Sequence, residues 1–218
     1  MANLNQTVSF KENEGNDPAC FLPEGSEALF HYIQEDLLND CDSNSEDEES
    51  SAEGYTVKVF LKAAEKGKID VVSKILDSNE SFINCKDCDG YTALHRASYN
   101  GHIEMVKLLI SLNADVNSVT NNMWQPLHSA CRWDQTAVAY ILLQNGADIN
   151  AQTCGGQTPL HLAVTYARGN SLLEVLLLNK KLDVNIVNCQ NKTALDLAKP
   201  LGKESLFEVV EDSINVQW

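Results

Sequence analysis

One short segment occurs three times in this sequence, at intervals of 33 residues. Its copies are Thr92-Ala93-Leu94-His95, Gln125-Pro126-Leu127-His128 and Thr158-Pro159-Leu160-His161. Each copy is followed by an Asp-x-Asn triplet, at residues 115–117, 148–150 and 183–185. Because a fixed period of this length is typical of arrays of similar units, the sequence predicts a stack of short units rather than a single globular core.

Each copy has the features of a helix start. Pro126 and Pro159 stand where the first helical residue is expected, a position that needs no backbone N–H. Thr92 and Thr158 precede this position as N-caps. A leucine and, three residues later, an alanine then share one helix face, and a second apolar run follows. Because this second run is too apolar to stand alone, each unit is predicted to be a helix–turn–helix that is stable only against its neighbours.

The period, the Thr-Pro-Leu-His segment and the Asp-x-Asn triplet occur together, and in this combination the chain resembles the ankyrin-repeat family. The resemblance implies an all-α fold, an ankyrin-repeat solenoid of stacked helix–turn–helix units with β-turn tips. It also implies that each signature histidine joins one hairpin to the next by hydrogen bonds. We therefore interpret the row of His95, His128 and His161 as structural and not as a metal site.

The repeat divides the second part of the chain into units. We expect an N-capping repeat at residues 55–86, ankyrin repeats at 87–119, 120–152 and 153–187, and a C-capping repeat at 188–218. The last ankyrin repeat has two extra residues, which fall either near residues 166–170 or near residues 180–181. In the final unit Asp196 replaces the signature histidine, and a closing helix is expected over residues 206–210.

Residues 1–54 form an acidic leader with fourteen acidic residues and one basic residue, in a chain of net charge −15. We expect it to be mostly disordered, because it is polar and highly charged. Apolar residues at helical spacing predict one short amphipathic helix at residues 26–38. This helix either docks on a partner or folds back onto the repeat stack. The acidic run at 40–53 is a solvated linker, a phosphorylated segment or part of an activation-type tail.

Composition and motifs argue against several classes of function. The repeats lack the basic surface that phosphate backbones require, so no direct nucleic-acid binding is expected. We expect no signal peptide and no membrane span, and the seven cysteines then indicate a reducing compartment, the nucleus or the cytoplasm. Cys85 and Cys88 have zinc-site spacing without a second pair, so no metal is expected. No catalytic motif is present, and we predict neither an enzyme nor a cofactor.

Partner binding is predicted on the exposed side of each first helix and on the hairpin tips, which form the concave face in the family. The resemblance places these residues there: Tyr91, Tyr99, Asn100, Trp124, Arg132, Trp133 and Tyr166. Aromatic residues and arginine dominate the energetics of protein interfaces, and both tryptophans are expected to be exposed. The alternative is that these rings pack on neighbouring tips and only stiffen the array.

The repeat at 120–152 departs from the pattern at two positions. Asp134 stands where the preceding repeat has Gly101, in a place that requires left-handed backbone. Gln125 replaces the capping threonine. We therefore expect this repeat to be locally less stable than the next one, with faster hydrogen exchange of its amides.

The predicted function is that of a non-catalytic adaptor, monomeric, whose concave face holds a protein partner. The acidic leader, the signature-poor first unit, Trp124 and the segment His128-Ser129-Ala130-Cys131 narrow the resemblance to one small adaptor of the family. That narrower resemblance implies a nuclear protein that acts in the regulation of gene expression. The alternative is a regulatory inhibitor that covers a partner's active site or localisation signal.

Overall fold

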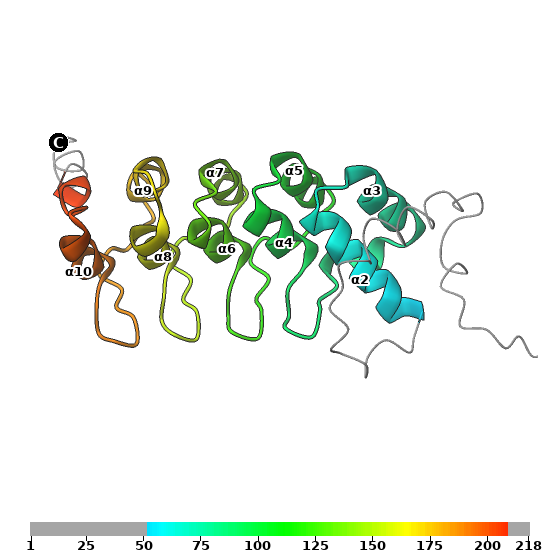
Figure 1. Ribbon diagram of the computed structural model, residues 1–218, viewed down its shortest axis with the longest axis horizontal. Coiled ribbons are helices and arrows are strands. Elements are labelled where there is room, and N and C mark those ends of the chain that lie inside the picture. The colour runs from blue at the N-terminus through cyan, green and yellow to red at the C-terminus, as the bar shows by residue number, and fades with distance from the viewer. Residues whose placement is uncertain (1–51, 209–218) are drawn as a thin grey trace, which may run out of the picture.

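Helix pairs stand side by side in a row, and a hairpin extends from the same side of successive pairs (Figure 1). This computed structural model describes residues 52–208, with side chains from Thr56 onward. Its elements are α2 (Ala52–Glu65), α3 (Ile69–Ser78), η3 (Glu80–Asn84), α4 (Ala93–Asn100), α5 (Ile103–Ser111), α6 (Pro126–Arg132), α7 (Thr136–Gln144), α8 (Pro159–Tyr166), α9 (Ser171–Leu177), α10 (Ala194–Ala198) and η4 (Lys199–Leu201). The predicted all-α stack is confirmed.

The helices begin where the repeated segment predicts. Pro126 and Pro159 are the first residues of α6 and α8, and Thr92 and Thr158 precede their helices in extended conformation. The helices α4 to α9 are seven to nine residues long. Isolated helices of this length are unstable in water, so packing between units must stabilise them.

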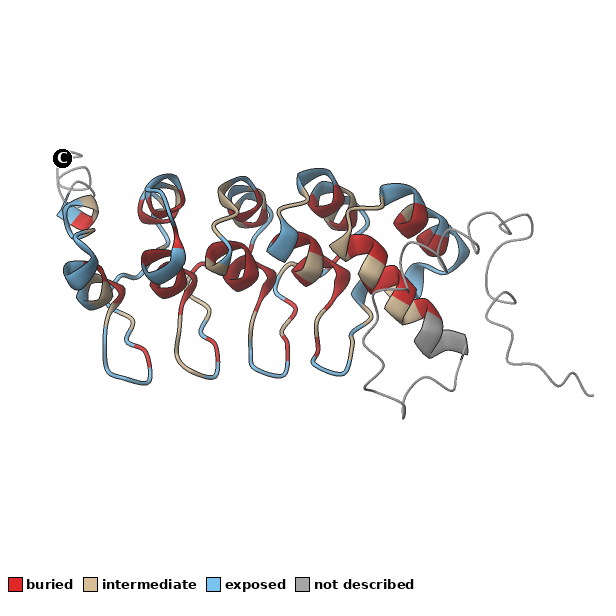
Figure 2. Cartoon of the chain, in the orientation of Figure 1, coloured by how far each residue is buried: buried red, intermediate tan, exposed pale blue. Residues whose placement is uncertain are grey.

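The core is one continuous layer between the helices of successive pairs (Figure 2). Each signature leucine is buried, as is each alanine three residues after it, which confirms that they share one face: Leu94, Leu127, Leu160, Ala97, Ala130 and Ala163. The small alanines allow the first helices to approach one another closely. Between residues 52 and 208, no helix is both long and apolar enough to cross a membrane.

The loops after the second helices are joined by side-chain hydrogen bonds that repeat from unit to unit. The backbone N–H groups of Asp115, Asp148 and Asp183 each donate, at 2.9 Å, to the Oδ1 atoms of Asn84, Asn117 and Asn150 respectively. Asn117 and Asn150 thus each bond the aspartate of the next triplet, and Asn84 does the same for the first triplet. This explains why the triplet recurs with the helices.

The turn after each first helix shows how the units differ. Gly101 ends α4 with φ = 74°, and a side chain there would collide with Gln135 of the next unit. Asp134, at the equivalent place after α6, also has left-handed backbone, with φ = 58°. Its Oδ2 accepts a hydrogen bond from the backbone N–H of Arg168 at 3.0 Å. The aspartate therefore joins two units, which offsets part of its backbone strain.

The predicted boundaries of the units stay a prediction. The chain is already helical at Ala52, the first residue that the structure describes, three positions before the predicted start of the repeats at residue 55. The connection between α8 and α9, residues 167–170, is longer than its counterpart at 101–102, so the extra residues lie at the first of the two predicted places. The predicted helix at 26–38, the rest of the leader and the end of the closing helix beyond Glu208 lie outside the described residues.

Candidate protein-interaction surface

The buried side of α4, α6 and α8 carries the signature histidines. The backbone N–H of Thr92 donates to Nδ1 of His95 at 3.2 Å, and the Thr92 hydroxyl lies 2.9 Å from the same nitrogen. Thr158 and His161 repeat this arrangement, with the hydroxyl 2.7 Å from Nδ1. Because Nδ1 accepts a backbone N–H, it carries no hydrogen, and the hydrogen of the neutral ring is on Nε2.

The other ring nitrogen of each histidine reaches the next hairpin. Nε2 of His95 donates to the Trp124 carbonyl at 2.9 Å. Nε2 of His128 donates to the carbonyls of Ala151 and Gln157, at 3.0 and 3.1 Å. Nε2 of His161 donates to the Lys192 carbonyl at 3.0 Å. These bonds confirm that the histidines join successive hairpins. We refer to the three histidines and their partners as the histidine rungs.

Burial keeps the histidine rungs uncharged. Desolvation lowers the pKa of His95 and of His128 from an ordinary 6.5 to about 4, against the opposing effect of their carbonyl acceptors. Desolvation also lowers the pKa of His161. Both nitrogens of each neutral ring are engaged, so none presents a lone pair to a metal ion.

The five described cysteines are free thiols. In the described part of the chain, no group of three or more His, Cys, Asp or Glu side chains is placed to hold a metal ion. Burial, with a smaller contribution from the charge of Asp87, raises the pKa of the Cys85 thiol to about 12. This thiol is therefore protonated at neutral pH, whereas zinc binds thiolates.

The exposed side of the same helices carries a continuous row of rings. The ring centroids of Tyr99, near the end of α4, and Trp133, directly after α6, are 4.5 Å apart. The guanidinium carbon of Arg132 lies 4.9 Å from the Trp133 ring centroid and 3.6 Å from that of Tyr166, at the end of α8. We call these four residues the ring ladder. It connects three consecutive units.

The ring ladder is accessible to a partner. Tyr99, Trp133 and Tyr166 are 43%, 44% and 43% exposed, although they contact one another or Arg132. Packing between units holds the rings in place, so little side-chain entropy remains to be lost on binding. The structure thus brings together Tyr99, Arg132, Trp133 and Tyr166 from the predicted surface.

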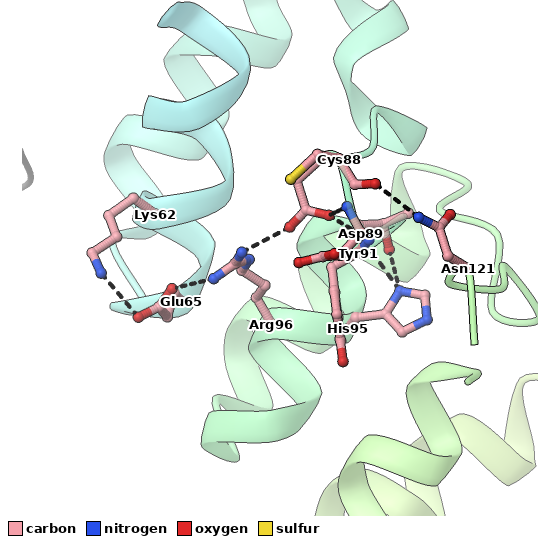
Figure 3. Close-up of polar contacts among 10 residues, drawn as sticks. Lys62, Glu65, Cys88, Asp89, Tyr91, His95, Arg96 and Asn121 are labelled. Carbon is pink, nitrogen blue, oxygen red and sulfur yellow. Dashed lines mark hydrogen bonds and ion pairs between the residues drawn. The ribbon is translucent and has the colours of Figure 1, made fainter. Parts of the chain in front are cut away.

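A shallow hollow of about 270 Å³ adjoins the ladder at Tyr99 and is also lined by Glu65, Tyr91 and Arg96. Figure 3 shows the polar contacts at its wall. Arg96 binds Glu65 and Asp87 through separate nitrogens, each at 2.7 Å. Because Glu65 belongs to α2, this arginine joins the first described unit to the next.

The other predicted surface residues are placed differently. The Tyr91 ring packs edge-on against His95, with centroids 5.7 Å apart, and is half-buried. Asn100 is exposed, and its side-chain amide donates to the Arg96 carbonyl at 3.0 Å. The expectation that Trp124 is exposed is wrong. It is half-buried against the core and its ring lies 6.1 Å from that of His128, because the hairpin tip turns the indole toward its own unit.

Two features of this surface were not predicted from the sequence. The pairing of Arg96 with Glu65 joins residues 31 positions apart, and no repeated pattern marks it. The stacking of Arg132 on Tyr166 joins adjacent positions of the repeat in consecutive units. The 33-residue spacing could have shown that these two side chains are neighbours, but not that the guanidinium lies over the tyrosine ring.

Comparison with known proteins agrees with this architecture. One family model, described as ankyrin repeats (3 copies), matches residues 19–120 and again 60–153, and a second, described as ankyrin repeats (many copies), matches residues 142–198. Together with the histidine rungs, these matches identify the class of protein. The chain belongs to the ankyrin-repeat family.

Within that family, the chain is similar to ankyrin repeat domain-containing protein 49. It is 39% identical to the Bos taurus protein over 205 residues, a match that covers 89% of this chain and 83% of the relative. It is 38% identical to the Homo sapiens protein over the same length, with the same coverage. The Drosophila melanogaster protein is 36% identical over 69 residues, or 32% of each chain. The narrower resemblance noted in the sequence is to this relative, and the similarity is confirmed.

Proposed function

We propose that the chain is a non-catalytic adaptor that binds a protein partner through the ring ladder. Ankyrin repeats are protein-interaction modules, and this class of domain is typically without catalytic activity. The single observation that carries the proposal is the ladder itself, three exposed aromatic rings and an arginine held in contact across three units. Tryptophan, tyrosine and arginine are the residues most enriched among interface hot spots.

We further propose that the adaptor is monomeric and acts in the nucleus, in the regulation of gene expression. The resemblance described above implies this role. The acidic leader with interspersed apolar residues supports it, because that composition is typical of activation segments. The alternative function, an inhibitor that covers a partner's active site or localisation signal, uses the same ladder.

Affinity purification with quantitative mass spectrometry tests the proposal. The full chain, an Arg132→Ala/Trp133→Ala variant and a Tyr140→Ala control are compared in nuclear and cytoplasmic extracts. Tyr140 is a matched control because it is also an exposed aromatic residue, but lies on the second helix α7. We expect nuclear proteins that are retained by the chain and by Tyr140→Ala and are lost with the ladder variant. Binding that ignores the ladder variant would contradict the proposal.

A further inference from the structure

Arg96 of α4 and Arg132 of α6 differ in what binds their charge. Arg96 holds a carboxylate on each of two nitrogens. Arg132 is fixed by stacking on Tyr166 and Trp133, and within residues 52–208 its guanidinium has no hydrogen-bond or ion-pair partner. When a guanidinium stacks on a ring, its N–H groups still point outward from the edge of the guanidinium plane. There they can form two parallel hydrogen bonds with a carboxylate. Arg132 is therefore prepared for an acidic ligand.

The surroundings of Arg132 further define that ligand. Trp133 and Tyr99 present exposed ring surface beside the guanidinium. Asp134, the nearest carboxylate along the chain, uses Oδ2 to accept the Arg168 backbone N–H. A segment that fits must carry a carboxylate for the arginine and apolar side chains, close in sequence, for the rings.

Residues 26–38 of the acidic leader combine five large apolar residues at helical spacing with two adjacent carboxylates. Residues 26–38 carry Leu29, Phe30, Ile33, Leu37 and Leu38 together with the adjacent carboxylates of Glu35 and Asp36. The run at 42–49 is denser in charge but has no apolar side chain. Of these two segments, only the first can cover rings and pair with a guanidinium at once.

Chain length also distinguishes the two segments. The described part of the chain begins at Ala52, within α2, and α2 packs on α4, which packs on α6. The length of α2, about 20 Å, and two helix-to-helix steps of about 10 Å place Arg132 up to roughly 40 Å from that point. Asp36 lies sixteen positions before Ala52, and a chain of that length can span about 55 Å, whereas Glu46 and Asp47 lie six and five positions before it and can span only about 20 Å.

We propose that residues 26–38 dock on the ring ladder of the same molecule, with Glu35 or Asp36 paired to Arg132 and apolar side chains on Trp133 and Tyr99. Because the segment is tethered, its effective concentration at the ladder is high, in the millimolar range for a flexible tether. An external partner must displace it. This inference goes beyond the proposed function and does not depend on who the partner is.

Photo-crosslinking tests the placement directly in the full chain. A benzophenone amino acid replaces Tyr99 and, in a matched variant, the exposed Tyr140 of α7. After irradiation of dilute monomer, mass spectrometry maps the linked peptides. We expect crosslinks from position 99 to residues 26–38 within one molecule, and none to that segment from position 140. Crosslinks from position 99 that occur only between molecules, or only to other segments, would overturn the inference.

Charge neutralisation tests the ion pair. In the full chain, Glu35→Gln/Asp36→Asn is compared with Glu46→Gln/Asp47→Asn, which removes the same charge from a segment too close to α2 to reach. The first variant should lower the crosslink yield from position 99 roughly three- to fivefold, the size expected for a surface ion pair, and the second should leave it unchanged. Equal loss in both variants would indicate non-specific attraction and would overturn the pairing.

A charge exchange completes the test. Arg132→Glu alone should move the Trp133 indole N–H resonance and lower the crosslink yield, because two carboxylates then face one another. Adding Glu35→Lys/Asp36→Lys to Arg132→Glu should restore most of the yield. Circular dichroism confirms that each variant keeps its helices. Failure of the combined variant to recover any yield, with the fold intact, would contradict the proposed pair.

Discussion

The two sides of α4, α6 and α8 follow different rules, although one backbone carries both. On the buried side, a capping residue and a histidine recur at each unit, and each histidine joins the carbonyl of the next hairpin. On the exposed side, Tyr99, Arg132 with Trp133, and Tyr166 differ from unit to unit yet meet in one ladder. The buried side is periodic because stacking requires the same bonds in every unit, and we propose that the exposed side differs from unit to unit because it recognises a particular partner.

The difference predicts that the two sides respond to different perturbations. Changes on the buried side should alter the free energy of unfolding, because they break bonds between units. Changes on the exposed side should alter binding more than the free energy of unfolding, because their rings are partly in water and make fewer contacts between units.

The largest expected effect is the loss of stability in mild acid. The pKa of His95 and His128 is about 4 in the folded chain and near 6.5 when unfolded, so the unfolded state binds more protons between these values. The stabilisation is complete above pH 6.5 and is lost as pH falls toward 4, on the order of 3 kcal/mol for each histidine.

Urea unfolding at successive pH values measures this effect, and NMR titration of the histidine ring protons measures the pKa values themselves. A free energy of unfolding that stays flat from pH 6.5 to 5, or ring protons that titrate near 6.5 in the folded chain, would show that the rungs are not held neutral.

Loss of the ladder should be the next largest effect, and it should appear in binding. With a partner identified by purification, Trp133→Ala should weaken binding by about 2 kcal/mol, roughly thirtyfold. Isothermal titration calorimetry with Tyr140→Ala as the control checks this. Equal loss in both variants would mean that the partner does not recognise the ladder specifically.

Replacing Gln125 by threonine in the histidine rung of His128 should raise the free energy of unfolding by about 1 kcal/mol. Oε1 of Gln125 is buried without a hydrogen-bond partner, whereas the threonines of the neighbouring rungs place a hydroxyl within 2.7–2.9 Å of the histidine Nδ1. Gln125→Thr restores that hydroxyl. The measurement is the urea midpoint, and hydrogen exchange of this repeat should slow toward that of the next. A destabilised variant would show that glutamine packing matters more than the cap.

The smallest expected effect is at a hairpin tip. Met123 has left-handed backbone, φ = 60°, where the tips of the flanking units have Gly90 and Gly156. Met123→Gly should stabilise the chain by about 0.5 kcal/mol, after the entropic cost of glycine. Gly156→Ala is the converse control, because its added carbon would lie 2.9 Å from the Cys189 backbone nitrogen. Thermal unfolding should rank the glycine variant above and the alanine variant below the native chain.

These contrasts explain what could be predicted from the sequence. The stack, the helix starts at Pro126 and Pro159 and the histidine rungs could be predicted, because each repeats with the period that produces it. Trp124 was placed wrongly, because a tip position does not show which way a side chain turns. The role of Asp134 was missed, since its bond to Arg168 belongs to one pair of units. Single contacts between units leave no periodic trace.

The free energies of unfolding of His128→Ala and Trp133→Ala, measured side by side in urea, test the division between the two sides most directly. We predict a loss of about 3 kcal/mol for His128→Ala, because it leaves buried backbone groups without partners. Trp133→Ala should cost clearly less, about 1 kcal/mol, because it removes only the partly exposed contacts with Tyr99 and Arg132. A loss for Trp133→Ala as large as that for His128→Ala would show that the exposed rings hold the stack together and are not reserved for a ligand.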